Sequence, residues 1–310
     1  MLQSKTRLYL LSVLTFLTFM DLEIASAAWN SSISFTTEER DSHVRQIQKV
    51  IETASSCLDT DLDTQQRVYQ QYGVSPFYGD RSFFGKLSYE DKFQELYRVF
   101  LEKGYREKEA SLLARHFRET MEPTSCVGLV LKCLGRGFKA AGQADLWARI
   151  RAYTDANGSD GTSLQNALQM LGWRVLYWNP WTAYNERWDQ IERSKDPENQ
   201  NRFWGWHSYR WSTVQKTGSY FWNKVDDAST LVDFGTRVPQ EFTKVPFFVG
   251  TAHTGYHVFP GHYGKVVEGH STRQITDSQT IESAPFNPLA DGGAPRGHYY
   301  SGLIAVPPGY

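Results

Sequence analysis

Residues 123–134 read PTSCVGLVLKCL, and this stretch decides the fold class because the pattern of the chain changes around it. The polar residues before the cysteine are natural N-caps, and the apolar residues after it have helical spacing. The spacing predicts a helix over 126–134, closed by Gly135 and Gly137. Helical patterns dominate on one side of this stretch and strand patterns on the other.

Upstream of this stretch, amphipathic spacing and capping residues predict a series of helices. The expected segments are a helix that starts at a capping box at Thr36 and continues through Ala54, a second over 64–72, a third capped by Ser88 and ended by Gly104, and a fourth over 106–120.

Downstream, one more helix is expected over 163–171, and the pattern then changes to short apolar runs between turn residues. The expected strands cover 173–178, 231–234, 246–249, 255–259, 265–269 and 302–306. Helices followed by antiparallel strands predict an α+β fold rather than a doubly wound sheet.

Residues 1–27 have the pattern of a signal peptide. A basic start precedes an apolar run of 13 residues over 8–20, and Ala25-Ser26-Ala27 supplies a small-residue cleavage site. Such a run gives about 20 Å of helix, which is short for a hydrocarbon core of about 30 Å. An exported mature chain, periplasmic or secreted in a bacterial envelope and without a membrane anchor, is therefore expected; the alternative is an uncleaved anchor.

The composition excludes several classes of protein. The 33 Lys and Arg residues balance 34 Asp and Glu residues, so the net charge is -1 and no nucleic-acid partner is expected. Apolar residues make up 40% and aromatic residues 15% of the chain, which excludes a disordered protein. The high aromatic content indicates a surface that binds a flat ligand.

The chain has three cysteines, so at least one thiol has no partner within the chain in an oxidising compartment. Cys126 and Cys133 are seven residues apart on one helix, about 10.5 Å of rise, which is too far for a disulfide. Either of them can pair with Cys57. Cys133, further along the helix, is expected to be inert, either buried or bonded to Cys57.

Cys126 is the candidate nucleophile. With Thr124 or Ser125 as the N-cap, this cysteine lies in the first turn of its helix. Unpaired amides and the positive end of the helix dipole favour the thiolate there, which is the form that attacks. The alternative is a small buried apolar residue like its neighbours.

His253 is the candidate base, in a predicted hairpin that covers 249–258 and 264–270. If the strand register pairs His253 with His270, Glu268 lies on the same face as His253. A histidine directed at a thiolate, with its tautomer fixed by a carboxylate or a second imidazole, is a Cys-His-polar arrangement. The alternative is an exposed hairpin with surface histidines.

Together these segments resemble the NlpC-type cell-wall peptidase family, which is papain-like. The family has a Cys-x-Gly-Leu-Val helix start, a His-x-Gly-x-x-Val strand and a Gly-Lys-x-x-polar partner strand; residues 126–130, 253–258 and 264–268 match them. The resemblance implies Cys126 as nucleophile and His253 as base of a hydrolase that cuts amide bonds in peptidoglycan stem peptides or cross-links.

The same resemblance implies a third, orienting residue and a division of the chain. Glu268 holds the orienting position in the motif, with His270 as its substitute. The implied units are an N-terminal helical region over 28–115 and a papain-like catalytic domain over 116–310. Residues 28–120 have no counterpart in the matched motifs.

An aromatic insertion separates the two motifs. Eight of the ten tryptophans fall within 173–222, and rings with a polar edge commonly line clefts where sugars stack. This insertion is expected to form a wall of the substrate cleft, although some of its rings must fill a core. The candidate substrate-binding residues are Trp178, Trp181, Trp204, Trp206 and Tyr256.

Other functions compete with the peptidase. A metal site built from His253, His257, His262 and His270 matches no common zinc spacing, so neither a metal nor another cofactor is expected. A serine hydrolase would need a Gly-x-Ser-x-Gly turn after a strand, which is absent. The main alternative is a non-catalytic peptidoglycan-binding protein with a degenerate peptidase fold. A third possibility retains the Cys-His pair and transfers the acyl group to an acceptor other than water.

Overall fold

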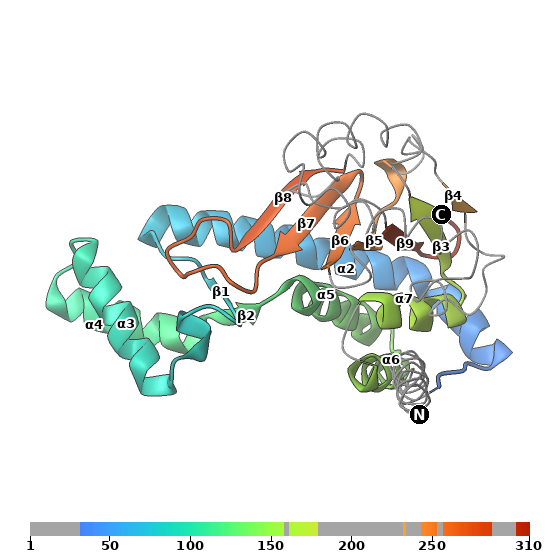
Figure 1. Ribbon diagram of the computed structural model, residues 1–310, viewed down its shortest axis with the longest axis horizontal. Coiled ribbons are helices and arrows are strands. Elements are labelled where there is room, and N and C mark those ends of the chain that lie inside the picture. Colours follow the sequence, from blue (N-terminus) through green and yellow to red (C-terminus); the bar gives the residue numbers. More distant parts are fainter. Residues whose placement is uncertain (1–31, 158–160, 179–231, 234–242, 253–256, 287–301) are drawn as a thin grey trace, which may run out of the picture.

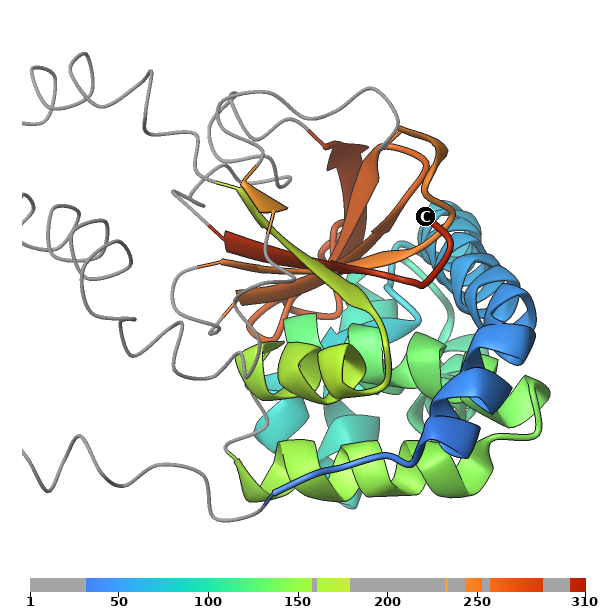
Figure 2. The same ribbon diagram turned by 90° about the vertical axis from the view of Figure 1, so that its right-hand side faces the viewer.

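The computed structural model describes residues 32–157, 161–178, 232–233, 243–252, 257–286 and 302–310. These residues form a mixed α+β structure in which the helices come first in the chain and most of the sheet comes later. Figure 2 shows the helices gathered on one face of the sheet. The fold class predicted from the sequence is confirmed at this level.

Six α-helices lie in the described part of the chain, and a short 3-10 helix lies at Phe84–Lys86. The α-helices are α2 (Thr37–Tyr72), α3 (Tyr89–Glu102), α4 (Glu107–Thr120), α5 (Cys126–Ala140), α6 (Ala144–Ala156) and α7 (Gly161–Met170).

The described strands form two sheets. The large sheet has the order β4-β3-β9-β5-β6-β7-β8, and its neighbours are antiparallel apart from the parallel pair β3–β4. Its strands are β3 (Arg174–Trp178), β4 (Val232–Asp233), β5 (Phe248–Ala252), β6 (His257–His262), β7 (Lys265–Gly269), β8 (Ile281–Pro285) and β9 (Gly302–Val306). The small sheet pairs β1 (Phe77–Gly79) in parallel with β2 (Glu122–Thr124).

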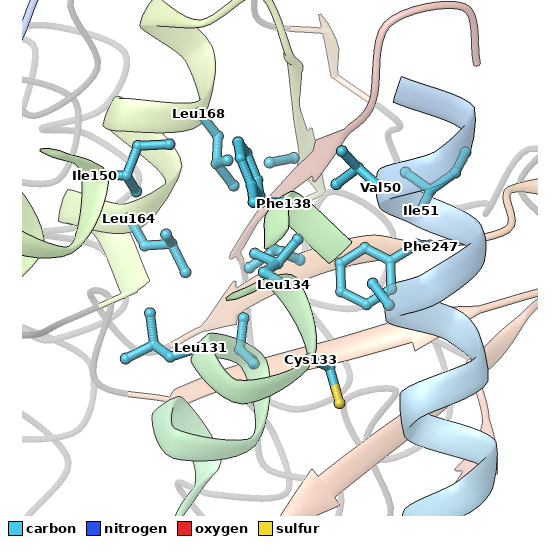
Figure 3. Packing of buried hydrophobic residues seen from close by; sticks show 14 of the residues in the cluster. Val50, Ile51, Leu131, Cys133, Leu134, Phe138, Ile150, Leu164, Leu168 and Phe247 are labelled. Carbon is cyan, nitrogen blue, oxygen red and sulfur yellow. The ribbon is translucent and has the colours of Figure 1, made fainter. Parts of the chain in front are cut away.

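One face of the large sheet packs on the helices. Its residues Val249, Val258 and Val267 share a buried cluster with side chains of α2, α5, α6 and α7. Figure 3 shows side chains of this cluster, among them Leu134 of α5 and Leu164 of α7. This side of the sheet is called the inner face below, and the opposite side the outer face.

Helix α2 is longer than the sequence predicts. Its capping box at Thr36 is confirmed, but a single helix of 36 residues replaces the two helices expected up to Ala54 and over 64–72. Polar residues between the two segments do not break it because tertiary contacts satisfy them. Ser55 Oγ donates a hydrogen bond to the carbonyl of Pro246, and Asp61 forms an ion pair with Lys132 of α5.

Helix α5 continues through the glycines that were expected to close it. It ends at Ala140, beyond Gly135 and Gly137. A side chain at position 137 would collide with the backbone of Val50 in α2, so this glycine permits two helices to approach closely. The glycine at position 137, which resembles a helix terminator in the sequence, instead allows α5 to pack closely on α2.

Helices α3 and α4 form an arm at the end of the molecule away from α6 and α7 (Figure 1). Their packing produces a second buried cluster, which includes Leu96, Phe100 and Phe117. Ile275, from the β7–β8 connection, belongs to the same cluster and attaches the arm to the sheet. Within the described residues, none of the helices combines the length and the apolar character that crossing a membrane requires.

His43 of α2 lies in a buried polar network. Its imidazole is 0% exposed, and Nε2 accepts a hydrogen bond of 2.9 Å from Trp173 Nε1. Because Nε2 is the acceptor, Nδ1 carries the hydrogen and donates to Gln143 Oε1 at 2.8 Å. The network is satisfied only when the imidazole is neutral.

The free energy of unfolding is therefore expected to fall in mild acid. Burial lowers the pKa of His43 from its ordinary value of 6.5, so below pH 6.5 the unfolded chain takes up a proton that the folded chain does not. Stability is greatest above that pH and falls by up to about 1.4 kcal/mol per pH unit below it, until the lowered pKa is reached. Denaturant unfolding across this range measures the slope.

His43→Gln is the matched variant, since an amide retains one donor and one acceptor. Its stability should depend less steeply on pH than that of the unsubstituted chain. An identical slope would assign the effect to another group, such as His262, whose pKa is also lowered by burial.

Candidate active site

Cys126 is the first residue of α5, as the sequence predicts. Ser125 is the N-cap: its backbone is extended, with φ -153 and ψ 170, and its Oγ accepts a hydrogen bond of 3.1 Å from the Gly128 amide. The Cys126 side chain is half-buried. The thiol therefore lies where the unpaired amides and the helix dipole favour a negative charge.

The other two cysteines form a disulfide. Cys57 of α2 and Cys133 of α5 are bonded, with their Cα atoms 5.4 Å apart. This bond confirms one of the two states expected for Cys133, and it leaves Cys126 as the free cysteine. The structure thus separates a cross-linking pair from a candidate nucleophile on the same helix.

Alkylation of the native, unreduced chain is expected to label Cys126 alone. Only this sulfur is both free and partly accessible, whereas Cys133 is 0% exposed and bonded to Cys57. Brief treatment with iodoacetamide near neutral pH, followed by mass spectrometry of the peptides, measures the label. Label on Cys133 with Cys126 protected would reverse the two assignments.

The end of β7 lies against the start of α5. A Cβ built at Gly269 would stand 2.7 Å from Thr124 Oγ1 and 2.8 Å from the Ser125 carbonyl oxygen. Only a residue without a side chain fits at this distance, and Gly269 therefore belongs to the inner face. The strand that carries Glu268 and leads into His270 thus ends beside the candidate nucleophile.

Glu268, His270 and Glu282 form a cluster at this end of the sheet. His270 Nε2 lies 2.7 Å from Glu282 Oε1 and 3.9 Å from Glu268 Oε2. Glu268 and Glu282 face each other across β7 and β8, and Glu268 is buried. An imidazole and two carboxylates within 4.8 Å of one another are donors that suit a divalent cation. In the structure, His270 and Glu282 form a hydrogen bond with each other.

The cluster is on the outer face of the sheet. Successive residues of a strand point to opposite faces, so Glu268 and His270 point away from the face that Gly269 shares with α5. The structure thus brings the two predicted orienting residues together. They lie at the end of β7 that is next to the start of α5, but on the face of the sheet opposite to Cys126. To orient a base beside Cys126, these side chains must reach around the end of the sheet.

The observed strand register differs from the pairing of His253 with His270. In the β6–β7 hairpin Gly261 pairs with Val266 and His262 with Lys265. Counted back along both strands, this register brings position 257, not 253, to the level of His270. His253 itself lies outside the described residues.

The strand that precedes His253 is anchored from the inner face. Thr251 Oγ1 donates a hydrogen bond of 2.7 Å to Gln165 Oε1, and Gln165 Nε2 donates one of 2.8 Å to the Val249 carbonyl. These buried contacts attach β5 to α7 up to the residue before its end at Ala252. Strand β5, which directly precedes the segment that contains His253, is therefore held in place by α7.

The remaining predicted residues fall where the structure gives no side-chain contacts. Tyr256, Trp181, Trp204 and Trp206 lie outside the described residues, and of Trp178 only the backbone at the end of β3 is described. Glu282 is a site residue that the sequence analysis missed. Its strand reads IESAP and shows no apolar alternation, so its pairing with β7 gives no sequence signal.

Comparisons with known proteins identify no relative. The chain matches no protein-family model. It also has no significant match among curated proteins or among solved structures. The likeness to NlpC-type peptidases therefore remains a resemblance of short motifs at Cys126, at His253 and at Glu268.

Proposed function

We propose that this protein is an exported cysteine hydrolase with a papain-like core that cleaves amide bonds in peptidoglycan stem peptides or cross-links. The observation that carries the proposal is the state of Cys126. It is the free cysteine, it opens a capped helix, and it is partly accessible, while the other two cysteines are bonded. A structural cysteine needs none of these features.

The chemistry follows from that position. The Cys126 thiolate attacks the carbonyl carbon of the scissile amide, and the first-turn amides of α5 stabilise the negative charge that develops on the carbonyl oxygen. His253 takes the thiol proton and delivers it to the departing amine, which leaves a thioester. Water, deprotonated by the same histidine, then hydrolyses the thioester and restores the thiol.

The third residue of the proposed triad comes from the cluster on β7 and β8. His270 follows the last residue of β7 and is less buried than Glu268, so it is the better placed of the two to reach around the end of the sheet. The hydrogen bond that its imidazole donates to the Glu282 carboxylate fixes its ring. We assign the orienting role to the Glu268–His270 pair, with Glu282 as its support.

Digestion of purified sacculi tests the proposal. The mature chain is incubated with sacculi, and soluble fragments and new primary amines are measured over time. Amide cleavage releases one amine for each bond cut, so both signals should rise together. Release of reducing sugars without amines would indicate a glycosidase and would refute the proposal.

A second function, a non-catalytic peptidoglycan-binding protein with a degenerate peptidase fold, is favoured by one observation. Glu268 and His270 point to the outer face of the sheet, whereas Cys126 starts a helix on the inner face. If this separation prevents a working triad, the chain should sediment with sacculi and release neither fragments nor amines. The same incubation therefore distinguishes the two functions.

A further inference from the structure

Three side chains of metal-ligating types meet on the outer face of the sheet. Glu268 belongs to β7, Glu282 to β8, and His270 follows the last residue of β7. One donor atom from each lies within 4.8 Å of the other two. Sequence spacing does not reveal this donor set, because only strand pairing brings Glu282 to the other two.

The separations of the donor atoms fit a tetrahedral cation. Zinc holds imidazole nitrogen and carboxylate oxygen at about 2.0–2.2 Å, which places neighbouring donors about 3.4 Å apart. His270 Nε2 lies 2.7 Å from Glu282 Oε1 and 3.9 Å from Glu268 Oε2, so the two distances bracket that value. Small side-chain shifts would therefore bring all three donors into coordination.

The two carboxylates repel each other in a way that a dication would relieve. Glu268 and Glu282 are direct cross-strand partners, and like charges in that arrangement are destabilising. Glu268 is only 6% exposed, so water screens the repulsion poorly. The His270 imidazole, even when protonated, offsets one of the two negative charges. A divalent cation between the carboxylates replaces the repulsion by attraction.

The backbone that carries the cluster is held in place. The His270 amide donates a hydrogen bond of 3.0 Å to the Thr280 carbonyl, which extends the β7–β8 pairing past the end of β7. The connection that follows is bound to the N-terminal region, since Arg81 N donates to the Ser271 carbonyl at 2.7 Å. Donors on fixed strands lose little conformational freedom when they bind an ion. The His270 side chain is 15% exposed, which gives an ion a route to the cluster.

We infer that Glu268, His270 and Glu282 form a binding site for a divalent transition-metal cation of the zinc class, which links β7 to β8. An imidazole with two carboxylates favours zinc over calcium or magnesium, which prefer oxygen ligands. In the bound state the imidazole carries its hydrogen on Nδ1, so that Nε2 offers its lone pair to the ion instead of donating to Glu282. Three protein donors leave the fourth position to water or another ligand.

The site does not depend on the proposed hydrolase. Neither the donor atoms nor the charge argument involves Cys126 or a substrate. If both proposals hold, the ion and the orienting role use the same His270 nitrogen and exclude each other.

Titration of the Cys126→Ala chain with zinc tests the inference. This background removes the free thiol, which is itself a metal ligand, and calorimetry measures the dissociation constant and the number of sites. Glu282→Gln and His270→Gln each remove one donor, so each should weaken the site about 100-fold or more. At a zinc concentration about 100 times the dissociation constant, the thermal midpoint of the background chain should rise by about 5 °C.

His116→Gln is the matched control, because His116 is an exposed histidine on α4. It should leave zinc binding unchanged, and calcium should bind the background about tenfold or more weakly than zinc. If His270→Gln and Glu282→Gln bind zinc as tightly as the background, the ion lies elsewhere and the inference is overturned. Equal affinity for calcium and zinc would show a site that makes no use of the imidazole, and would overturn it as well.

X-ray absorption of the zinc-loaded background keeps the test decisive if a variant fails to fold. The spectrum should show one imidazole nitrogen and otherwise oxygen ligands. Two or more imidazoles would place the ion on other histidines and refute the site. None of these measurements uses amine release from sacculi, so failure of the hydrolase and failure of the metal site are observed separately.

Discussion

Replacing Cys126 by Ala is expected to abolish the release of amines from sacculi, with a loss of about 10⁴-fold or more in rate. The thiolate forms the covalent bond of the proposed reaction, and removing the nucleophile of a triad leaves only the catalysis that binding provides. Cys126→Ser should be nearly as inactive, because a hydroxyl is not ionised near neutral pH. Initial rates of amine release measure both variants.

Folding and wall binding are the controls for these variants. Cys126 is only half-buried and its side chain is no cap, so Ala should leave the thermal midpoint and sedimentation with sacculi close to those of the unsubstituted chain. Full activity in Cys126→Ala would end the hydrolase proposal.

Replacing His253 by Ala should cause a loss as large as that of Cys126→Ala. The base activates the nucleophile and protonates the leaving amine, so without it neither half of the reaction proceeds efficiently. Glu268→Ala and His270→Ala should show intermediate losses, because an orienting group acts only through the base. The pH profile of amine release separates the two kinds of loss, since an orienting residue shifts the profile of the base.

His257→Ala is the comparison that can contradict this assignment. His257 starts β6, and the observed register brings position 257 to the level of His270. If His257→Ala is inactive while His253→Ala retains activity, the base is His257 and the motif match at His253 is misleading.

Local signals in the sequence predict those parts of the structure that local physics determines. The capped start of α5 at Cys126 follows from one polar side chain that satisfies one amide. The strands β7 and β9 occupy the predicted residues 265–269 and 302–306 because their apolar runs end at turns. In each case the information lies within a few residues of the boundary.

Tertiary contacts decide the features that the sequence could not predict. The polar residues Ser55 and Asp61 lie between the two helices expected from the sequence, and their partners on other elements are visible only in the structure. Gly137 looks like a terminator until α2 lies against it. Helix α6 and strand β8 were missed altogether.

The candidate site shows the same division between local and long-range information. The position of Cys126 depends on its own helix start and was predictable. The face on which Glu268 and His270 point depends on the β6–β7 register and on the contact of Gly269 with the start of α5. Neither can be obtained from the motif, which fixes the order of residues but not the side of the sheet.

The Cys57–Cys133 disulfide makes the stability of the folded chain depend on the redox state of its surroundings. The bond joins residues 76 positions apart, and closing a loop of that length removes conformational freedom from the unfolded chain worth about 4 kcal/mol. That amount is comparable to the whole net stability of many domains. In a reducing compartment the folded state would lack this contribution and open more often, and oxidation would supply it. Helix α5, which carries the candidate nucleophile, is therefore most stable in an oxidising compartment.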